Sequence, residues 1–214
     1  MKIVVLGDSF TFGQGCSDAF PVIGKKAPSA YSWPSLLQQY LPNSVVDNRA
    51  ITGNNNMTMI ESLYQELTTD INTIIFCASF AMRIAVRVPD YEEFATLSIS
   101  PHWSTESTEL GFNDAIANYY KHLYSDRVGY NTAATAVMAA YGCARLVGAD
   151  FFWSKPANQQ PTTTNKIFDH LAPYQFMSST DFEYADIELE SCRHPNNAGH
   201  ARYFKQVIMP LLQL

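Results

Sequence analysis

Short apolar runs bounded by turn residues recur along the chain and predict strands. Residues Ile3 to Leu6 form an apolar run rich in β-branched side chains, which ends at Gly7 and is too short for a helix. The run from Thr73 to Ala78 gives the strongest signal for a buried strand. Two weaker candidates are residues 44–48 and 149–153. The first run therefore predicts a buried parallel strand, and the others predict its partners.

Amphipathic stretches lie between these runs and predict helices. In the first stretch, apolar residues at positions 33, 36, 37, 40 and 41 follow the spacing i, i+3, i+4, i+7 and i+8 of one helix face. The other expected helices cover 60–67, about 113–124, 133–144 and 204–211. The segments 88–111 and 154–190 show no regular period, and we expect loops there.

The alternation of strands and helices predicts the fold class. Strands connected through helices at this spacing imply right-handed crossovers and a parallel sheet with helices on both faces. We therefore expect an α/β fold, a flavodoxin-like three-layer α/β/α sandwich with a parallel sheet of about five strands. The chain has 214 residues and no internal repeat, so a single domain over 1–214 is expected.

Composition then narrows the classes of function. Hydrophobic residues make up 47% of the chain and charged residues 16%, which indicates a folded protein. The net charge is −6 and the basic residues are scattered, so no nucleic-acid partner is expected. The apolar run at the N-terminus is far too short for a signal peptide or a membrane span. We therefore expect a cytoplasmic protein that does not bind a membrane.

The cysteines argue against two further classes. Cys16, Cys77, Cys143 and Cys192 lie far apart and lack the Cys-x-x-Cys or Cys/His spacing of metal ligands. Neither a zinc site nor a disulfide framework is expected, and the four residues are interpreted as reduced thiols.

Candidate chemistry begins where the first strand ends, at Gly7-Asp8-Ser9. In open parallel sheets, sites form at the carboxyl ends of the strands. Gly7 permits a tight turn and Asp8 can bond the turn backbone. Ser9 would then project from the strand end with its own N–H directed into the crevice.

A second candidate lies near the other end of the chain. His194 is followed by Pro195 and by a polar loop that leads into the last helix, which Asn196 or Asn197 can cap. A nucleophilic serine hydroxyl needs a base of near-neutral pKa within hydrogen-bond reach, and a histidine meets this need. We therefore pair Ser9 and His194 as candidate nucleophile and base.

Both ends of the chain resemble a known family. Gly7-Asp8-Ser9-Phe10, together with His194-Pro195-Asn196 and Gly199, is similar to the first and last blocks of the SGNH (GDSL-type) hydrolases. The resemblance implies that Ser9 is the nucleophile and His194 the base of an ester hydrolase without a cofactor. The run from Asn48 to Asn54 resembles the second block of the family, which implies that the N–H groups of Gly53 and Ser9 form the oxyanion hole.

Two positions depart from the family pattern. The third block, Gly-x-Asn-Asp after the third strand, is replaced by Cys77-Ala78-Ser79-Phe80, so Ser79 takes the position of the third oxyanion donor. The same motif occurs at residues 111–114, but it follows a polar loop, and we expect Asn113 to cap a helix instead. The family also places an Asp three residues before its histidine, and this residue is Ser191 here.

The group that orients the His194 imidazole is therefore open. Ser191 or a backbone carbonyl would accept a hydrogen bond from Nδ1 in a Ser–His dyad, which is our first expectation. Alternatively, Glu190, Glu188 or Asp186 would supply a carboxylate and complete an imperfect triad. The loss of an oxyanion donor costs roughly 10²- to 10³-fold in rate, so low activity is one expected outcome.

The segment after the third strand carries a finer resemblance. A polar third block followed by an arginine, here Ser79 to Arg83, resembles a divergent branch of the family met in phage genomes, and the run Asn118 to Tyr120 adds to this likeness. A phage-encoded protein would act in the cytoplasm of the host. Arg83 and Arg87 are first expected on an exposed helix face; if they face the crevice instead, they favour an anionic substrate.

Three functions follow from these residues. The first is a serine ester hydrolase, similar to esterases and acetylesterases, that acts on a small-molecule or carbohydrate ester. The second keeps the fold without the chemistry, as a binding or virion-associated protein that recognises a carbohydrate or a protein, and the departures at Ser79 and Ser191 support it. The third is an FMN site over Ser9 to Gly15, which leaves His194 without a role.

Overall fold

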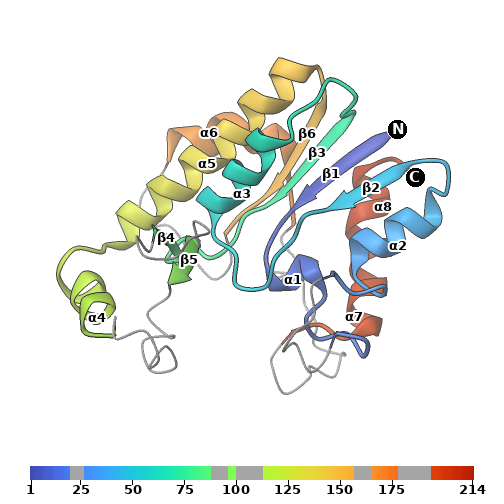
Figure 1. The fold of residues 1–214 in the computed structure, drawn as a ribbon. Coiled ribbons are helices and arrows are strands. Elements are labelled where there is room, and N and C mark those ends of the chain that lie inside the picture. The colour runs from blue at the N-terminus through green and yellow to red at the C-terminus, as the bar shows by residue number, and fades with distance from the viewer. Residues whose placement is uncertain (20–26, 88–95, 100–112, 157–164, 178–193) are drawn as a thin grey trace.

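The computed structural model describes residues 1–19, 27–87, 96–99, 113–156, 165–177 and 194–214. Their central element is a five-stranded sheet with the strand order β2-β1-β3-β6-β7. Each neighbouring pair of these strands is parallel. Helices cover both faces of the sheet (Figure 1). The expected three-layer α/β/α sandwich with a flavodoxin-like strand order is thus confirmed.

The strands form where the apolar runs predict them. β1 (Lys2–Leu6), β2 (Val45–Asn48), β3 (Thr73–Cys77) and β6 (Asp150–Ser154) correspond to the four runs. Every position of β3 is buried, as expected for the middle strand of a sheet that is covered on both faces. The fifth strand, β7 (Gln175–Phe176), lies where the sequence predicts a loop.

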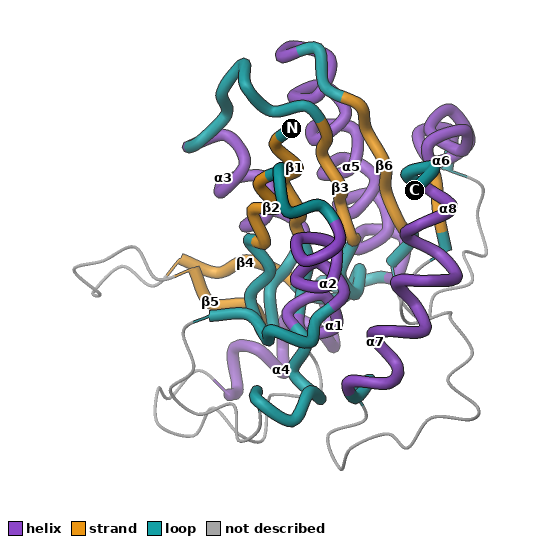
Figure 2. Tube along the Cα trace, turned by 90° about the vertical axis from the view of Figure 1, so that its right-hand side faces the viewer, coloured by secondary structure: helices purple, strands orange, loops and turns teal. Residues whose placement is uncertain are grey.

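Two groups of helices enclose the sheet (Figures 1 and 2). One face is covered by α3 (Asn56–Gln65), α5 (Asp126–Val147) and α6 (Lys166–Leu171). The other face is covered by α2 (Trp33–Tyr40) and by the C-terminal segment, which consists of α7 (Asn197–Tyr203), a π-helical turn (Phe204–Ile208) and α8 (Met209–Leu211).

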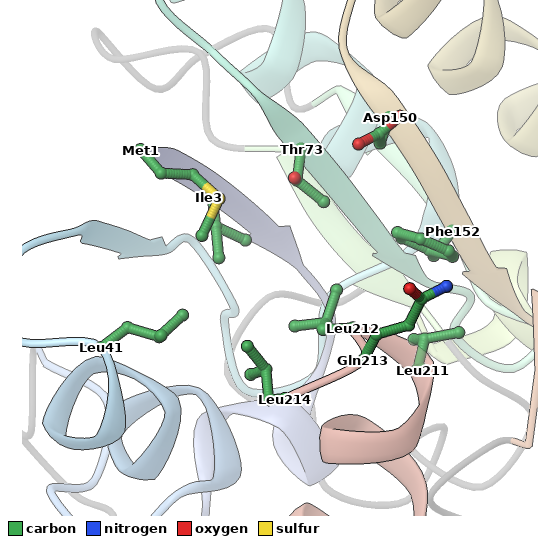
Figure 3. A pocket seen from close by; sticks show the side chains of 10 residues that line it. All are labelled: Met1, Ile3, Leu41, Thr73, Asp150, Phe152, Leu211, Leu212, Gln213 and Leu214. Carbon is green, nitrogen blue, oxygen red and sulfur yellow. The ribbon is translucent and has the colours of Figure 1, made fainter.

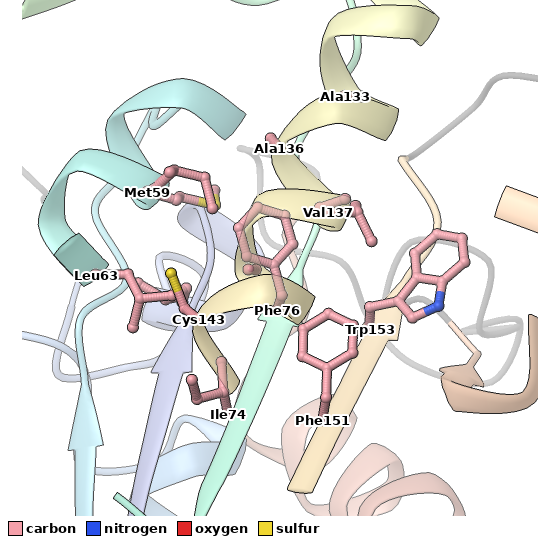
Figure 4. Close-up of a cluster of buried hydrophobic side chains, with 14 of the residues drawn as sticks. Met59, Leu63, Ile74, Phe76, Ala133, Ala136, Val137, Cys143, Phe151 and Trp153 are labelled. Atoms are coloured by element: carbon pink, nitrogen blue, oxygen red, sulfur yellow. The ribbon is translucent and has the colours of Figure 1, made fainter. Parts of the chain in front are cut away.

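Alternate residues of the strands point into two separate hydrophobic clusters. In β1, Ile3 and Val5 belong to the cluster under α2, whereas Val4 and Leu6 belong to the cluster under α3 and α5. Figure 4 shows the second cluster, in which small residues of α5 pack over aromatic side chains of β3 and β6. The small residues let α5 approach the sheet closely. This close packing holds in place the strands whose carboxyl ends carry the candidate site.

Several short elements were not expected from the sequence, whereas α4 (Asn113–His122) begins at the expected residue. One unexpected element is a separate antiparallel pair of strands, β4 (Ile84–Arg87) and β5 (Thr96–Ile99). The four-residue helix α1 (Ser9–Phe12) and the 3-10 turn Ala172–Tyr174 were also missed. These elements are too short to show a hydrophobic period.

Other expectations concern cysteines, metals and membranes. Cys16, Cys77 and Cys143 are buried and form no disulfide bond with one another, and Cys192 lies outside the described residues. Over the described ranges, no cluster of three or more His, Cys, Asp or Glu side chains could hold a metal ion. No helix in the same ranges is both long enough and apolar enough to cross a membrane.

Candidate active site

The candidate residues lie on loops at one edge of the sheet. The strand order changes direction between β1 and β3, and in open α/β sheets the binding crevice forms at the carboxyl ends of the strands at this point. The loops that leave β1, β2 and β3 carry Ser9, Gly53 and Ser79 respectively. Because these three strands are parallel neighbours, their loops emerge side by side.

Ser9 is the first residue of α1 and follows a tight turn. Asp8 caps this helix, since its Oδ1 accepts a hydrogen bond from the N–H of Phe10 at 3.1 Å and its carbonyl oxygen accepts from the N–H of Thr11 at 3.0 Å. A Cβ at Gly7 would overlap the side chain of Thr11, so the turn requires glycine. The turn leaves Ser9 only 2% exposed.

The imidazole of His194 reaches the hydroxyl of Ser9. His194 Nε2 lies 2.8 Å from Ser9 Oγ, inside the range of about 2.6–3.2 Å that a nucleophile and its base require. The ring of Phe10 packs against the imidazole with a centroid distance of 4.8 Å. The structure thus brings together two residues that are 185 positions apart, while their catalytic roles stay a prediction.

The segment that follows His194 is held by two asparagines at the start of α7. Asn196 caps α7 by accepting a hydrogen bond from the N–H of Gly199 at 3.1 Å, which selects Asn196 from the two expected caps. Asn197 instead bonds Ser17, accepting from its N–H at 3.0 Å and donating to its Oγ at 2.9 Å. These contacts tie the start of α7 to the loop after α1.

Gly53 occupies a left-handed position in the loop after β2. Its φ of 75° is a conformation that glycine adopts without strain. This loop is tied to the end of β1, because the N–H of Ile51 and the side-chain amide of Asn54 donate to the carbonyl of Gly7 at 3.2 and 3.5 Å. In the described part of the chain, the backbone N–H groups of Ser9 and Gly53 have no hydrogen-bond partner.

Asn56 fixes the backbone after β3, a role that the sequence analysis missed. Its Oδ1 accepts from the N–H of Ser79 at 2.8 Å and its Nδ2 donates to the carbonyl of Ser79 at 3.2 Å. The side chain is buried at the start of α3, so both bonds are shielded from water. The run of three asparagines after Gly53 is the one sequence signal that could have pointed to this contact.

The hydroxyl of Ser79 is used inside the protein. Its Oγ lies 2.9 Å from Asp8 Oδ2 and 2.8 Å from the carbonyl oxygen of Asn54, and it accepts from Arg83 Nη1 at 2.8 Å. A hydroxyl donates a single proton, and both acceptors within reach are protein groups. The arrangement gives no support to Ser79 as a third oxyanion donor, because its side chain holds the turn instead.

The side chain of Arg83 is nearly buried, and the expectation of an exposed helix face is wrong for this residue. Its Nη1 donates to Asp8 Oδ2 at 2.9 Å and to the carbonyl of Asn54 at 3.2 Å, and the guanidinium carbon lies 4.6 Å from the ring centre of Phe80. The side chains of Arg83 and Asp8 are 10% and 8% exposed. Burial lowers the pKa of Arg83, and the carboxylate of Asp8 opposes this shift. The turn after β3 thus supplies the cation that a buried carboxylate needs.

Comparison with known proteins finds solved structures that share this architecture. No protein-family model and no curated protein matches the sequence. Among solved structures, TesA has a TM-score of 0.55 at 14% identity, with 100% of this chain and 98% of TesA covered. The psychrotrophic esterase EstA from Pseudoalteromonas sp. has a TM-score of 0.54 at 15% identity, with 100% and 99% covered. A lipolytic protein of the G-D-S-L family from Desulfitobacterium hafniense has a TM-score of 0.51 at 16% identity, with 95% of each chain covered.

The chain has the fold of the GDSL-type lipolytic proteins. In this fold, Ser9 lies just after β1, and His194 lies just before α7. The end of β3, where the resemblance leads one to expect an asparagine, holds the buried Arg83–Asp8 pair and Ser79 instead.

A second histidine lies in α7, the helix that follows the candidate base His194. His200 is buried in α7, and its Nδ1 accepts from the backbone N–H of Trp33, the first residue of α2, at 3.2 Å. Burial and, to a smaller extent, the charge of His194 lower the pKa of His200 to about 4. His200 is therefore neutral near pH 7 and caps α2, since the side chain of the N-cap residue Ser32 accepts no hydrogen bond from a backbone N–H of this helix.

Some expected residues of the candidate active site lie outside the described part of the chain. Ser191, Glu190, Glu188 and Asp186 are among them, so the partner of His194 Nδ1 stays a prediction. The side chains of Arg87 and Asn113 are not described either.

A separate pocket lies at the end of the sheet opposite the candidate active site (Figure 3). It has a volume of about 260 Å³ and is lined by residues at the start of three strands, among them Ile3, Thr73 and Asp150, and by the last residues of the chain. Since Ser9 follows the other end of β1, this pocket is not part of the candidate active site.

Proposed function

We propose that the protein is a serine hydrolase that cleaves esters, with Ser9 as nucleophile and His194 as base. The 2.8 Å contact between Ser9 Oγ and His194 Nε2, at the carboxyl edge of the sheet, carries this proposal. The GDSL-type fold supports it, because the structures it resembles include an esterase and a lipolytic protein. An FMN site at this loop would leave the contact between the two side chains without a function.

The proposed reaction follows the usual steps of acyl transfer. Ser9 Oγ attacks the acyl carbonyl while His194 Nε2 takes its proton, and the imidazolium then returns this proton to the leaving alcohol. The N–H groups of Ser9 and Gly53 stabilise the oxyanion that forms on the carbonyl oxygen. Water activated by His194 finally hydrolyses the acyl-enzyme and frees Ser9.

Two features of the site favour an ester over an amide. An alkoxide leaves more readily than an amine, which must be protonated first, so an ester tolerates an imperfect site. The oxyanion hole rests on two backbone donors, and a missing third donor costs roughly 10²- to 10³-fold in rate. We therefore propose a slow hydrolase of small-molecule or carbohydrate esters. We further propose a cytoplasmic site of action, in a host cell if the protein is phage-encoded.

The orienting group of His194 is proposed to be neutral. Ser191 or a backbone carbonyl accepts from Nδ1 in this proposal, and Glu190 is the alternative. Ser191→Asp should then raise kcat, because a carboxylate also stabilises the imidazolium. A Ser191→Asp variant without any gain, together with a Glu190→Gln variant that loses most of the activity, would favour the displaced triad.

Hydrolysis of p-nitrophenyl acetate tests the proposed function. The wild type should hydrolyse this ester at least tenfold faster than Ser9→Ala and His194→Ala, whereas Ser44→Ala, a serine on a loop between α2 and β2, serves as the unaffected control. Equal rates for the wild type and Ser9→Ala would refute the proposal. That result would favour a binding or virion-associated protein, the second candidate, which the engagement of the Ser79 hydroxyl supports.

A further inference from the structure

One nitrogen atom of Arg83 joins three segments of the chain. Nη1 donates to the carboxylate of Asp8 after β1, to the carbonyl of Asn54 after β2, and to the hydroxyl of Ser79 after β3, at 2.9, 3.2 and 2.8 Å. The first two segments carry Ser9 and Gly53, the residues whose N–H groups face the oxyanion in the proposed function. The geometry of these donors therefore depends on a side chain that belongs to neither segment.

The charge of Arg83 also matters for the reaction. Asp8 directly precedes Ser9, and its second oxygen caps α1 through the N–H of Phe10. An unpaired carboxylate at this place would repel the negative charge that develops on the substrate during attack. The side chains of Arg83 and Asp8 are both nearly buried, so water screens the pair only weakly. Arg83 cancels the charge of Asp8 beside the reacting atoms.

We propose that Arg83 is a positioning residue of the active site, which holds the nucleophile turn and the oxyanion loop in register and neutralises Asp8. The inference rests on the proposed function and concerns the same site. It predicts two separable effects of Arg83. The hydrogen bonds set the position of the donors, which affects kcat, and the charge sets the electrostatic field at His194, which affects the pH profile.

The test compares Arg83→Gln with a matched control. Arg49 is also a nearly buried arginine at this edge of the sheet, where it pairs with Asp47 at 2.7 Å and with Glu66 at 3.1 Å, and it touches none of the candidate catalytic residues. The partner carboxylates Asp47 and Glu66 are 33% and 68% exposed, so Arg49→Gln reports the effect of losing an arginine ion pair away from the candidate catalytic residues. All variants are assayed for p-nitrophenyl acetate hydrolysis at a temperature where thermal unfolding curves show them folded.

The expected results differ between the two variants. Arg83→Gln should lower kcat about 10- to 100-fold with KM within about threefold, because misplaced donors act mainly on the transition state. The acid limb of its kcat/KM profile should move up by about half a pH unit, because the unpaired Asp8 stabilises the protonated form of His194. Arg49→Gln should keep both kcat and the acid limb of the wild type.

Two further variants keep the inference falsifiable if Arg83→Gln fails to fold. Arg83→Lys retains the charge with a shorter reach, so it should keep the acid limb of the wild type and recover part of kcat. The double variant Asp8→Asn/Arg83→Gln removes both charges, so its acid limb should return to that of the wild type while kcat stays low. Neither pattern is expected from a residue that only stabilises the fold.

Each outcome supports or overturns the inference. A folded Arg83→Gln or Arg83→Lys protein with the kcat and the acid limb of the wild type overturns it and leaves the proposed function intact. A loss of kcat as large in Arg49→Gln, with no shift of the acid limb in either variant, overturns it as well. A wild type without hydrolysis that depends on Ser9 overturns the proposed function and this inference together.

Discussion

The backbone of His194 and Pro195 passes close to Gly15. A Cβ at position 15 would lie 2.5 Å from the carbonyl oxygen of Pro195 and 2.6 Å from that of His194. Both neighbours are backbone atoms, so the segment would have to move away. Since the contact between His194 and Ser9 is 2.8 Å long, a shift of about 1 Å would break this hydrogen bond.

We expect Gly15→Ala to lower the hydrolysis that depends on Ser9 by about 10²-fold, because a misplacement of about 1 Å costs that much. Gly142→Ala is the matched control, since Gly142 lies within α5 and a Cβ there meets nothing within 4 Å. This control should keep the rate and gain about 0.5–1 kcal/mol in the free energy of unfolding. Equal rates in both variants would contradict the role of Gly15.

His200 should make the stability of the protein depend on pH. Its pKa is about 4 in the folded protein, against 6.5 without burial, so the unfolded chain binds more protons between these values. Its contribution is therefore complete above pH 6.5 and is lost as the pH falls towards 4. The loss amounts to at most about 3 kcal/mol in the free energy of unfolding.

Urea unfolding of His200→Gln at several pH values measures this effect. A glutamine can still accept from the N–H of Trp33 but does not titrate, so the variant should lose less stability than the wild type between pH 7 and pH 4. His170→Gln, at an exposed position near the end of α6, should follow the wild type. Parallel curves for the wild type and His200→Gln would exclude the assignment.

Single residues also show what the sequence could predict of the site. Ser9, His194 and Gly53 stand in recognisable motifs, so their placement on adjacent loops could be expected. The burial of Arg83 could not, because its partner Asp8 is 75 positions away and the ion pair exists only in the folded sheet. The same holds for His200, whose partner belongs to another helix.

At the scale of elements, helix caps position the candidate base. Asn196 caps α7 directly after His194, and Ser125 caps α5 by accepting a hydrogen bond from the N–H of Val128 at 3.3 Å. Loss of either cap removes one partner of a helix N-terminus, which costs about 1 kcal/mol in the free energy of unfolding. The two caps also differ in their distance from His194 along the chain.

Asn196→Ala and Ser125→Ala should therefore lose about the same stability, about 1 kcal/mol, while only Asn196→Ala loses ester hydrolysis. Asn196→Asp keeps an acceptor at the helix N-terminus and should retain both stability and rate. Thermal unfolding and hydrolysis of p-nitrophenyl acetate check the three variants. A similar loss of activity in Ser125→Ala would show that the effect is general and not due to the position of His194.

Long or strongly apolar elements could be located from the sequence, whereas very short ones could not. β1 and β3 carry strongly apolar patterns, and the structure forms them where the sequence places them. The helix expected at 133–144 is confirmed as part of the longer α5, which covers Asp126–Val147. The helix expected at 60–67 begins earlier, at Asn56, because Asn55 accepts from the N–H groups of Met57 and Thr58. β7 was missed because two residues show no period, so pairing with β6 determines its place.

At the scale of the whole molecule, the sheet assembles a site from distant segments. Two hydrophobic clusters hold β1 and β3 between helices on both faces, which fixes the ends of these strands. His194, at the start of the last described range, then meets Ser9 from the loop after β1. The alternation of strands and helices was sufficient to predict this architecture. It could not predict the contacts at the edge of the sheet, because these depend on side chains from four loops.

The nucleophilic role of Ser9 is the central claim, and reaction with a fluorophosphonate tests it most directly. Intact mass and peptide mapping of the treated protein locate the adduct. We predict one adduct on Ser9 in the wild type, none in Ser9→Ala, and labelling of His194→Ala slowed by at least about 10²-fold, because the hydroxyl loses its base. An unlabelled wild type, or an adduct on another residue that persists in Ser9→Ala, would contradict the account.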